Sequence, residues 1–144
     1  MRFFFYGSLL DHDVTAIVVG RRLPPAAWLP ATLPGHRRTL ARGVSYPVLV
    51  RDPRDTVRGA VVGGFSALEV ERLAAYEGPR YRIAPLKVRL GGMMTVVSVF
   101  EPVEQAFEPV GGHWDLAQWQ RRDKKRFVDR IRRAFSAHPA YSRT

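Results

Sequence analysis

The sequence predicts an α+β domain whose sheet is mixed or mostly antiparallel, with closure into a barrel as one option. Expected strands outnumber expected helices, and their order is not the regular strand–helix–strand alternation of parallel α/β folds. Eleven prolines and twelve glycines in 144 residues favour many turns and short elements over a helix bundle. The length suits one domain over residues 1–144, and 46% hydrophobic residues are enough for a core.

The first part of the chain alternates between a clear strand and a segment that is hard to assign. RFFFY, residues 2–6, reads as a buried strand because it is short, aromatic and ended by a glycine. Within residues 11–43, DVTAIVVG fits a short helix or a turn, and LPPAAWLPATLPG is interrupted by prolines. Two more strands are expected, over 43–52 with Pro47 at an edge or bulge, and over 56–65 with bends at glycines.

The middle of the chain carries the best helix signal. SALEVERLAAYEG, residues 66–78, begins with a Ser-x-x-Glu capping box formed by Ser66 and Glu69. Gly78 stands where a glycine commonly ends a helix. The sequence therefore predicts a helix between these two signals.

A hairpin and a long helix are expected to follow. YRIAPLKVRL and MMTVVSVFE flank the two-residue turn Gly91-Gly92, and FEPVGGH reads as a loop. Residues 114–135 predict one amphipathic helix. We expect a core at about 1–110 and a C-terminal helix at about 114–136 packed on it.

The net charge of +10 is concentrated in that helix, since the chain from His113 onward has nine Lys or Arg and three Asp. One side of the helix is apolar (Leu116, Trp119, Phe127, Ile131, Ala134, Phe135) and the other is basic (Arg121, Arg122, Lys125, Arg126, Arg132, Arg133). The basic side is either the solvated face of a packed helix or a nucleic-acid surface. We favour the solvated face, because the basic side lacks the interleaved aromatic residues that stack on bases.

Several classes of site and location are disfavoured. The chain has no cysteine, no Gly-x-x-x-x-Gly-Lys-Ser/Thr loop and no Gly-x-Gly-x-x-Gly turn. Its four histidines, at positions 12, 36, 113 and 138, are too scattered to suggest a zinc site. No apolar run is long enough to span a bilayer, and the N-terminal run lacks a basic flank and a cleavage site, so we expect a cytoplasmic protein.

The break between the first strand and the next segment is one candidate functional feature. A glycine directly after a buried strand, as in Tyr6-Gly7-Ser8-Leu9, lets the backbone turn sharply and lets a ligand approach. Successive N–H groups outside the sheet can then point into one concavity that binds a carboxylate or an oxyanion. The alternative is an ordinary turn that ends a strand.

Glu77 is the second candidate. It follows Val70, Leu73 and Ala74 at helical spacing, which places its carboxylate on the apolar face of the expected helix. Burial and the negative end of the helix dipole both raise the pKa of such a carboxyl toward the range useful for proton transfer. Alternatively, the side chain reaches solvent past Gly78 or pairs with an arginine at position 80 or 82.

Taken together, these features resemble the gamma-glutamylcyclotransferase-like superfamily, and its avirulence-induced-gene-like branch most closely. The resemblance is carried by FFYGSLLD (4–11), YPVLV (46–50), VRGAVVGGF (57–65), LAAYEGPRYRIAPLKV (73–88) and GGHWDLAQW (111–119). The order and spacing of these segments cover most of the chain, and residues 11–43 are covered least.

The resemblance implies a small mixed β-barrel with packed helices, and it implies a site. The loop matching Tyr6-Gly7-Ser8-Leu9-Leu10 would hold the glutamyl part of a substrate, Glu77 would be the catalytic acid and base, and Tyr81 would lie beside the pocket. Many relatives carry Tyr-x-Arg after the glutamate, whereas here Tyr81 is followed by Arg82 and then Ile83. The implied partner is a small γ-glutamyl compound.

The implied reaction is intramolecular aminolysis. The free α-amine of a γ-glutamyl group attacks its own side-chain carbonyl, which gives 5-oxoproline and releases the attached amine or amino acid. This chemistry needs no metal or organic cofactor. Two alternatives stay open: a non-catalytic module that binds a small carboxylate or a peptide end, and nucleic-acid binding through the basic helix. The sequence does not indicate an oligomeric state.

Overall fold

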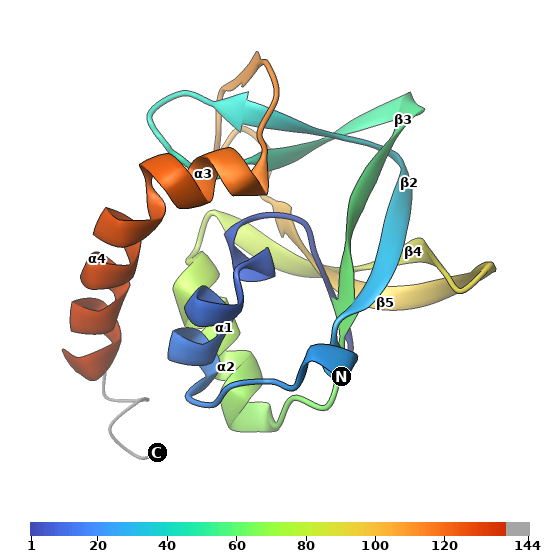
Figure 1. The fold of residues 1–144 in the computed structure, drawn as a ribbon. Helices are drawn as coiled ribbons and strands as arrows, with labels where there is room; N and C mark the ends of the chain where they lie inside the picture. Colours follow the sequence, from blue (N-terminus) through green and yellow to red (C-terminus); the bar gives the residue numbers. More distant parts are fainter. Residues whose placement is uncertain (138–144) are drawn as a thin grey trace.

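Five strands close into a mixed barrel, and four helices pack beside it in the part of the chain that the structure describes (Figure 1). The structure is a computed structural model that describes residues 1–137, with side chains up to Phe135; His138 lies outside this range. The strands are β1 (Phe3–Phe5), β2 (Leu29–Ala41), β3 (Val48–Val62), β4 (Tyr81–Leu90), β5 (Met93–Pro102) and β6 (Pro109–Gly111). The helices are α1 (His12–Val19), α2 (Ala67–Glu77), α3 (Leu116–Arg122) and α4 (Lys124–Ala137), with short 3₁₀ helices η1 (Ser8–Leu10) and η2 (Pro25–Ala27).

The pairing of β2 with β3 closes the barrel. The strand order is β3-β1-β5-β4-β2, β2 pairs back onto β3, and β6 extends β2 outside the ring. Strand β1 runs antiparallel to β3 and parallel to β5, while the other pairs are antiparallel. The expected α+β fold with a mixed barrel is therefore confirmed.

Strand β1 separates two cores, because successive side chains of a strand point to opposite faces. Phe4 lies inside the barrel, in a cluster that includes Leu33, Val61 and Val99. Phe3 and Phe5 lie outside the barrel, in the second cluster between the strands and the helices. Since both faces of β1 are buried, its end is a rigid support for the residues that follow.

Strands β2 and β3 differ from the prediction. Strand β2 fills much of the segment that could not be assigned, and β3 is one strand of 15 residues where two strands were expected. The prolines of β2 are accommodated because the pairing shifts between Pro34 and His36, where Gly35 has a φ of 76°. Tyr46 and Pro47 lie before β3 rather than within a strand.

The predicted helix and hairpin are confirmed. Ser66 caps α2 through the reciprocal capping box with Glu69, and Gly78 ends the helix with a φ of 81°. Strands β4 and β5 pair along their whole length, and both turn glycines, Gly91 and Gly92, have positive φ.

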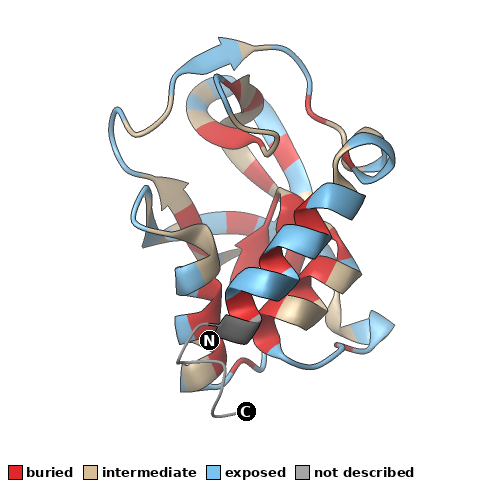
Figure 2. Cartoon of the chain, turned by 90° about the vertical axis from the view of Figure 1, so that its left-hand side faces the viewer, coloured by how far each residue is buried: buried red, intermediate tan, exposed pale blue. Residues whose placement is uncertain are grey.

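The long helix expected over 114–135 is two helices. Helix α3 ends at Asp123, whose N–H donates to Trp119 O at 2.8 Å, and α4 begins directly after it. The apolar side chains Trp119, Phe127, Ile131 and Phe135 are buried, whereas Ala134 is exposed. The opposite face of α4 is exposed (Figure 2). None of the helices described in residues 1–137 is long and apolar enough to cross a membrane.

Candidate active site

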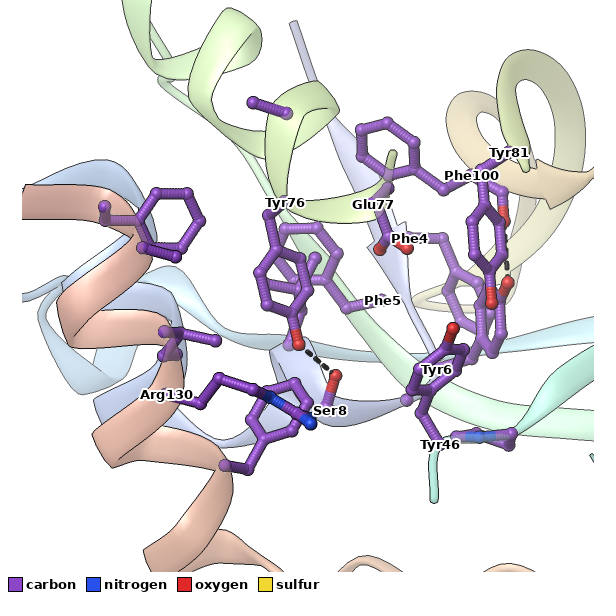
Figure 3. A pocket seen from close by; sticks show the side chains of 18 residues that line it. Phe4, Phe5, Tyr6, Ser8, Tyr46, Tyr76, Glu77, Tyr81, Phe100 and Arg130 are labelled. Carbon is purple, nitrogen blue, oxygen red and sulfur yellow. Dashed lines mark hydrogen bonds between the residues drawn. The ribbon is translucent and has the colours of Figure 1, made fainter. Parts of the chain in front are cut away.

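A pocket of about 300 Å³ lies where the end of β1, the end of α2 and the side of α4 meet (Figure 3). Small-molecule sites in proteins have volumes of ~300–1,000 Å³ and are mostly apolar with a few polar groups. The lining of this pocket fits that description. Phenylalanine and tyrosine side chains dominate it, and its charged residues are Glu77 and Arg130. The pocket is therefore the candidate active site.

The loop after β1 forms one wall. Residues 6–9 line the pocket, whereas Leu10, which was also expected at the site, packs against the core between strands and helices. Helix η1 begins in this loop: Leu10 N–H donates to Gly7 O at 2.9 Å, and Asp11 N–H donates to Ser8 O at 3.0 Å. The first N–H groups of such a turn have no acceptor within it. They are the groups that an anion at this wall can use.

Close packing accounts for the glycine at position 7. A Cβ atom on Gly7 would lie 3.2 Å from Pro47 Cγ, which is a tight contact across the pocket wall. On the other side of the loop, the Tyr6 hydroxyl donates to Phe100 O at 2.6 Å, and Arg38 Nη1 donates to Tyr6 O at 2.8 Å. These contacts fix the loop against the barrel.

Glu77, the last residue of α2, points its carboxylate into the pocket (Figure 3). Burial raises the pKa of this carboxyl to about 8, in the direction predicted from the sequence. No hydrogen bond or ion pair joins it to another residue of 1–137. The two arginines considered as partners bind elsewhere: Arg82 pairs with Glu101 at 2.8 Å, and Arg80 donates to Ala106 O while its guanidinium lies over Phe107.

Tyrosines surround Glu77. Tyr81 lines the pocket, as do Tyr46 and Tyr76, which were not predicted. The pKa values of Tyr76 and Tyr81 are raised above the ordinary value. The main cause is burial, and the second is the negative charge of Glu77. The pKa of Tyr6 is also raised, first by burial. These phenols stay protonated at neutral pH and keep their O–H groups as donors.

Comparison with known proteins identifies the family. The model of the family described as gamma-glutamyl cyclotransferase, AIG2-like, matches residues 3–116. This chain belongs to that family. AIG2-like protein A of Arabidopsis thaliana is 31% identical over 132 residues, which cover 90% of this chain and 78% of that protein. Protein AIG2 C of Arabidopsis thaliana is 30% identical over the same shares of the two chains.

Solved structures share the fold. The solution structure of an Arabidopsis thaliana protein superposes with a TM-score of 0.66 at 28% identity, covering 94% of this AIG2-like chain and 90% of that one. A structure titled gamma-glutamyl cyclotransferase superposes with a TM-score of 0.57 at 19% identity, covering 75% and 68% of the two chains. At this level of identity, the similarity to the second structure shows that the two proteins share a fold.

The AIG2-like family match ends at Leu116, yet α4 forms a further wall of the pocket. Arg130 on this wall was not among the predicted site residues. The sequence shows only that it stands beside the apolar stripe, three residues after Phe127, and this spacing does not indicate what that side of the helix faces. Tyr76 packs its ring against Phe127 and Phe135, with ring centroids 6.1 Å apart in each pair. Helix α4 is thus in contact with the end of α2 that carries Glu77.

Proposed function

We propose that the protein is a cyclotransferase that converts a γ-glutamyl amine or γ-glutamyl amino acid into 5-oxoproline and the free amine or amino acid. One observation carries this proposal. Glu77, a carboxylate without a partner among residues 1–137, shares a small pocket with the loop after β1, whose first N–H groups are free of the turn. The family of the chain supports the same reaction class.

The reaction rearranges bonds within one substrate. The α-amine nitrogen of the glutamyl group bonds to the side-chain carbonyl carbon and closes the five-membered ring of 5-oxoproline. The bond between that carbon and the leaving nitrogen then breaks, without oxidation and without consumption of water. A pocket that holds the glutamyl chain folded brings the nitrogen to the carbon and lowers the entropic part of the barrier.

In this mechanism Glu77 moves the proton. Its carboxylate accepts a proton from the substrate ammonium, which makes the nitrogen nucleophilic, and returns that proton to the leaving nitrogen as its bond to carbon breaks. The ring nitrogen loses its second surplus proton by the same route, so the leaving group departs as an ammonium. A pKa of about 8 suits both steps near neutral pH, because the group exchanges protons easily in either direction. The N–H groups of Ser8 and Leu9 would stabilise the negative oxygen that develops on the carbonyl.

The test is the substitution Glu77→Gln, which keeps the size of the side chain and removes its ability to accept a proton. Release of 5-oxoproline from a panel of γ-glutamyl amines and γ-glutamyl amino acids should fall by about 10²–10⁴-fold. Glu71→Gln is the matched control, because Glu71 lies on the exposed side of the same helix. Undiminished turnover in Glu77→Gln would eliminate the mechanism.

A further inference from the structure

Helix α4 closes the pocket with one continuous face. Five residues that line the pocket come from it (Phe127, Arg130, Ile131, Ala134, Phe135), at positions i, i+3, i+4, i+7 and i+8. The helix is held in place at its start, where Lys124 Nζ lies 2.8 Å from Asp11 Oδ2 and 2.7 Å from Asp13 Oδ2. This face is therefore a fixed wall of the pocket.

Arg130 is the one cationic side chain on the pocket wall within the described residues. It forms no ion pair with any residue of 1–137, and its guanidinium carbon lies 5.2 Å from the Phe127 ring. In Figure 3 its side chain extends from α4 toward Ser8 and Tyr76. A guanidinium that faces a pocket without an internal partner suits a carboxylate of a ligand, because its planar fork matches carboxylate geometry.

The two charged groups of the pocket wall come from different elements, Glu77 from the end of α2 and Arg130 from α4. In the proposed function, Glu77 and the loop after β1 hold the glutamyl group, so the leaving group extends toward α4. We infer that α4 forms the leaving-group subsite, with the free carboxylate of a leaving amino acid on Arg130 and its apolar side chain against Phe127 and Ile131. The protein would then prefer γ-glutamyl amino acids with apolar side chains over γ-glutamyl amines. This inference rests on the proposed function.

A matched pair of substrates tests the carboxylate contact. γ-Glutamyl-leucine and γ-glutamyl-isoamylamine differ only in the carboxylate of the leaving group. The wild-type protein should have at least about tenfold higher kcat/KM for the first compound. Arg130→Gln should lower kcat/KM for γ-glutamyl-leucine by about 10–100-fold, the range for loss of a charged hydrogen bond. It should change the value for γ-glutamyl-isoamylamine by less than threefold.

The control variant is Arg126→Gln. Arg126 is on the exposed side of α4, with 81% of its side chain accessible; its contacts with the described residues are an ion pair with Asp123 and a hydrogen bond to Arg122 O. This variant should treat both substrates as the wild-type protein does. An equal loss on both substrates in Arg130→Gln would place the glutamyl α-carboxylate on this arginine and overturn the inference. No loss on γ-glutamyl-leucine would overturn it too.

The apolar part of the subsite has its own test. γ-Glutamyl-aspartate carries a second carboxylate that would face Phe127, Ile131 and Phe135, and desolvation of that charge is costly. Its kcat/KM should be at least about tenfold lower than that of γ-glutamyl-leucine. Equal kcat/KM for the two compounds would contradict an apolar leaving-group subsite.

A binding experiment tests the Arg130 contact even if the proposed function fails. If the wild-type protein released no 5-oxoproline from any compound of the panel, calorimetric binding of γ-glutamyl-leucine would still test the contact. Weaker binding in Arg130→Gln and unchanged binding in Arg126→Gln would support the carboxylate site. Unchanged binding in both variants would overturn it.

Discussion

The Oγ atom of Ser8 and the Oη atom of Tyr76 lie 2.5 Å apart, although the two residues are 68 positions apart in the chain (Figure 3). Ser8 belongs to the loop after β1, and Tyr76 directly precedes Glu77. The contact therefore joins the wall that would hold the substrate to the end of α2, next to the residue that would move its proton.

We expect this hydrogen bond to appear as a coupling energy. Ser8→Ala and Tyr76→Phe each leave a hydroxyl without its partner, so the double variant should lose less stability than the sum of the two. The coupling should be about 0.5–1.5 kcal/mol in urea unfolding. Tyr46→Phe is the control, because Tyr46 lines the same pocket without a hydrogen bond to the described residues. Its effect should add to that of Ser8→Ala, and an additive Ser8–Tyr76 pair would show that the contact contributes nothing.

The pKa of Glu77 predicts the pH dependence of catalysis. Burial raises this pKa from 4.5 to about 8, so the free protein holds the proton below that pH and the carboxylate base forms as the pH rises. The value of kcat/KM should therefore increase with pH through about 8. The rise in kcat should lie at lower pH, because the bound substrate ammonium favours the carboxylate. Steady-state kinetics between pH 5 and 9 would measure both, and a flat kcat/KM profile would contradict the assignment.

The same shift predicts how stability changes with pH. A carboxyl whose pKa is higher in the folded state binds its proton more tightly there, so its contribution to folding is lost as the pH rises from about 4.5 through 8. Glu77→Gln has no such loss. The melting temperature of this variant minus that of the wild-type protein should therefore increase as the pH is raised from 5 to 9. A constant difference across that range would mean that the carboxyl has an ordinary pKa.

Lys124 should matter for both stability and activity, because it ties the start of α4 to Asp11 and Asp13. Asp11 is 1% exposed, caps α1, and also accepts a hydrogen bond from Gln120 Nε2 at 2.9 Å. Because Asp11 keeps these hydrogen-bond donors in Lys124→Met, we expect the variant to lose only about 1–2 kcal/mol of unfolding free energy, measured in urea. KM for the best substrate should rise because the α4 wall loses its anchor. Lys125→Met, at the exposed neighbouring position, should stay within about 0.5 kcal/mol of wild type; equal effects of the two variants would refute the anchor.

Gly59 should tolerate no side chain. A Cβ atom there would lie 2.1 Å from Phe5 O and 2.7 Å from the Phe4 ring, beside the antiparallel pairing of β3 with β1. Relief would require moving a backbone carbonyl, so Gly59→Ala should cost about 3 kcal/mol in chemical denaturation. Gly63→Ala is the matched control, since its new Cβ would meet only the side chain of exposed Arg2, which can move away. An unfolding midpoint of Gly59→Ala equal to that of the wild-type protein would be inconsistent with this close contact.

Local signals were sufficient for part of the fold and part of the candidate site. Helix α2 was predicted because its start and end are both encoded within a few residues, in the capping box and in Gly78. Helical spacing also placed Glu77 on the apolar side of α2, and the pocket there agrees with that placement.

Long-range contacts decided the rest. The prolines of β2 left this segment unassigned, because the bulge after Pro34 that accommodates them appears only in the pairing with β3. The sequence RRDKKR contains no glycine or proline to end a helix, so the break at Asp123 could not be predicted from local patterns. The place of Arg130 on the pocket wall depends on how α4 meets the end of α2, which no local pattern encodes.

The place of β1 between β3 and β5 in the barrel wall has a consequence for the time during which the chain is being synthesised. Its parallel neighbour is β5, and Ser98 N–H donates to Arg2 O at 2.9 Å, so the first strand depends on residues made almost a hundred positions later. Until then, the three consecutive phenylalanines lack the part of their core that β5 supplies, which includes Val99 and Phe100. Closure of this barrel therefore waits until β5 has been made, and the nascent chain until then presents an aromatic segment that chaperones can bind.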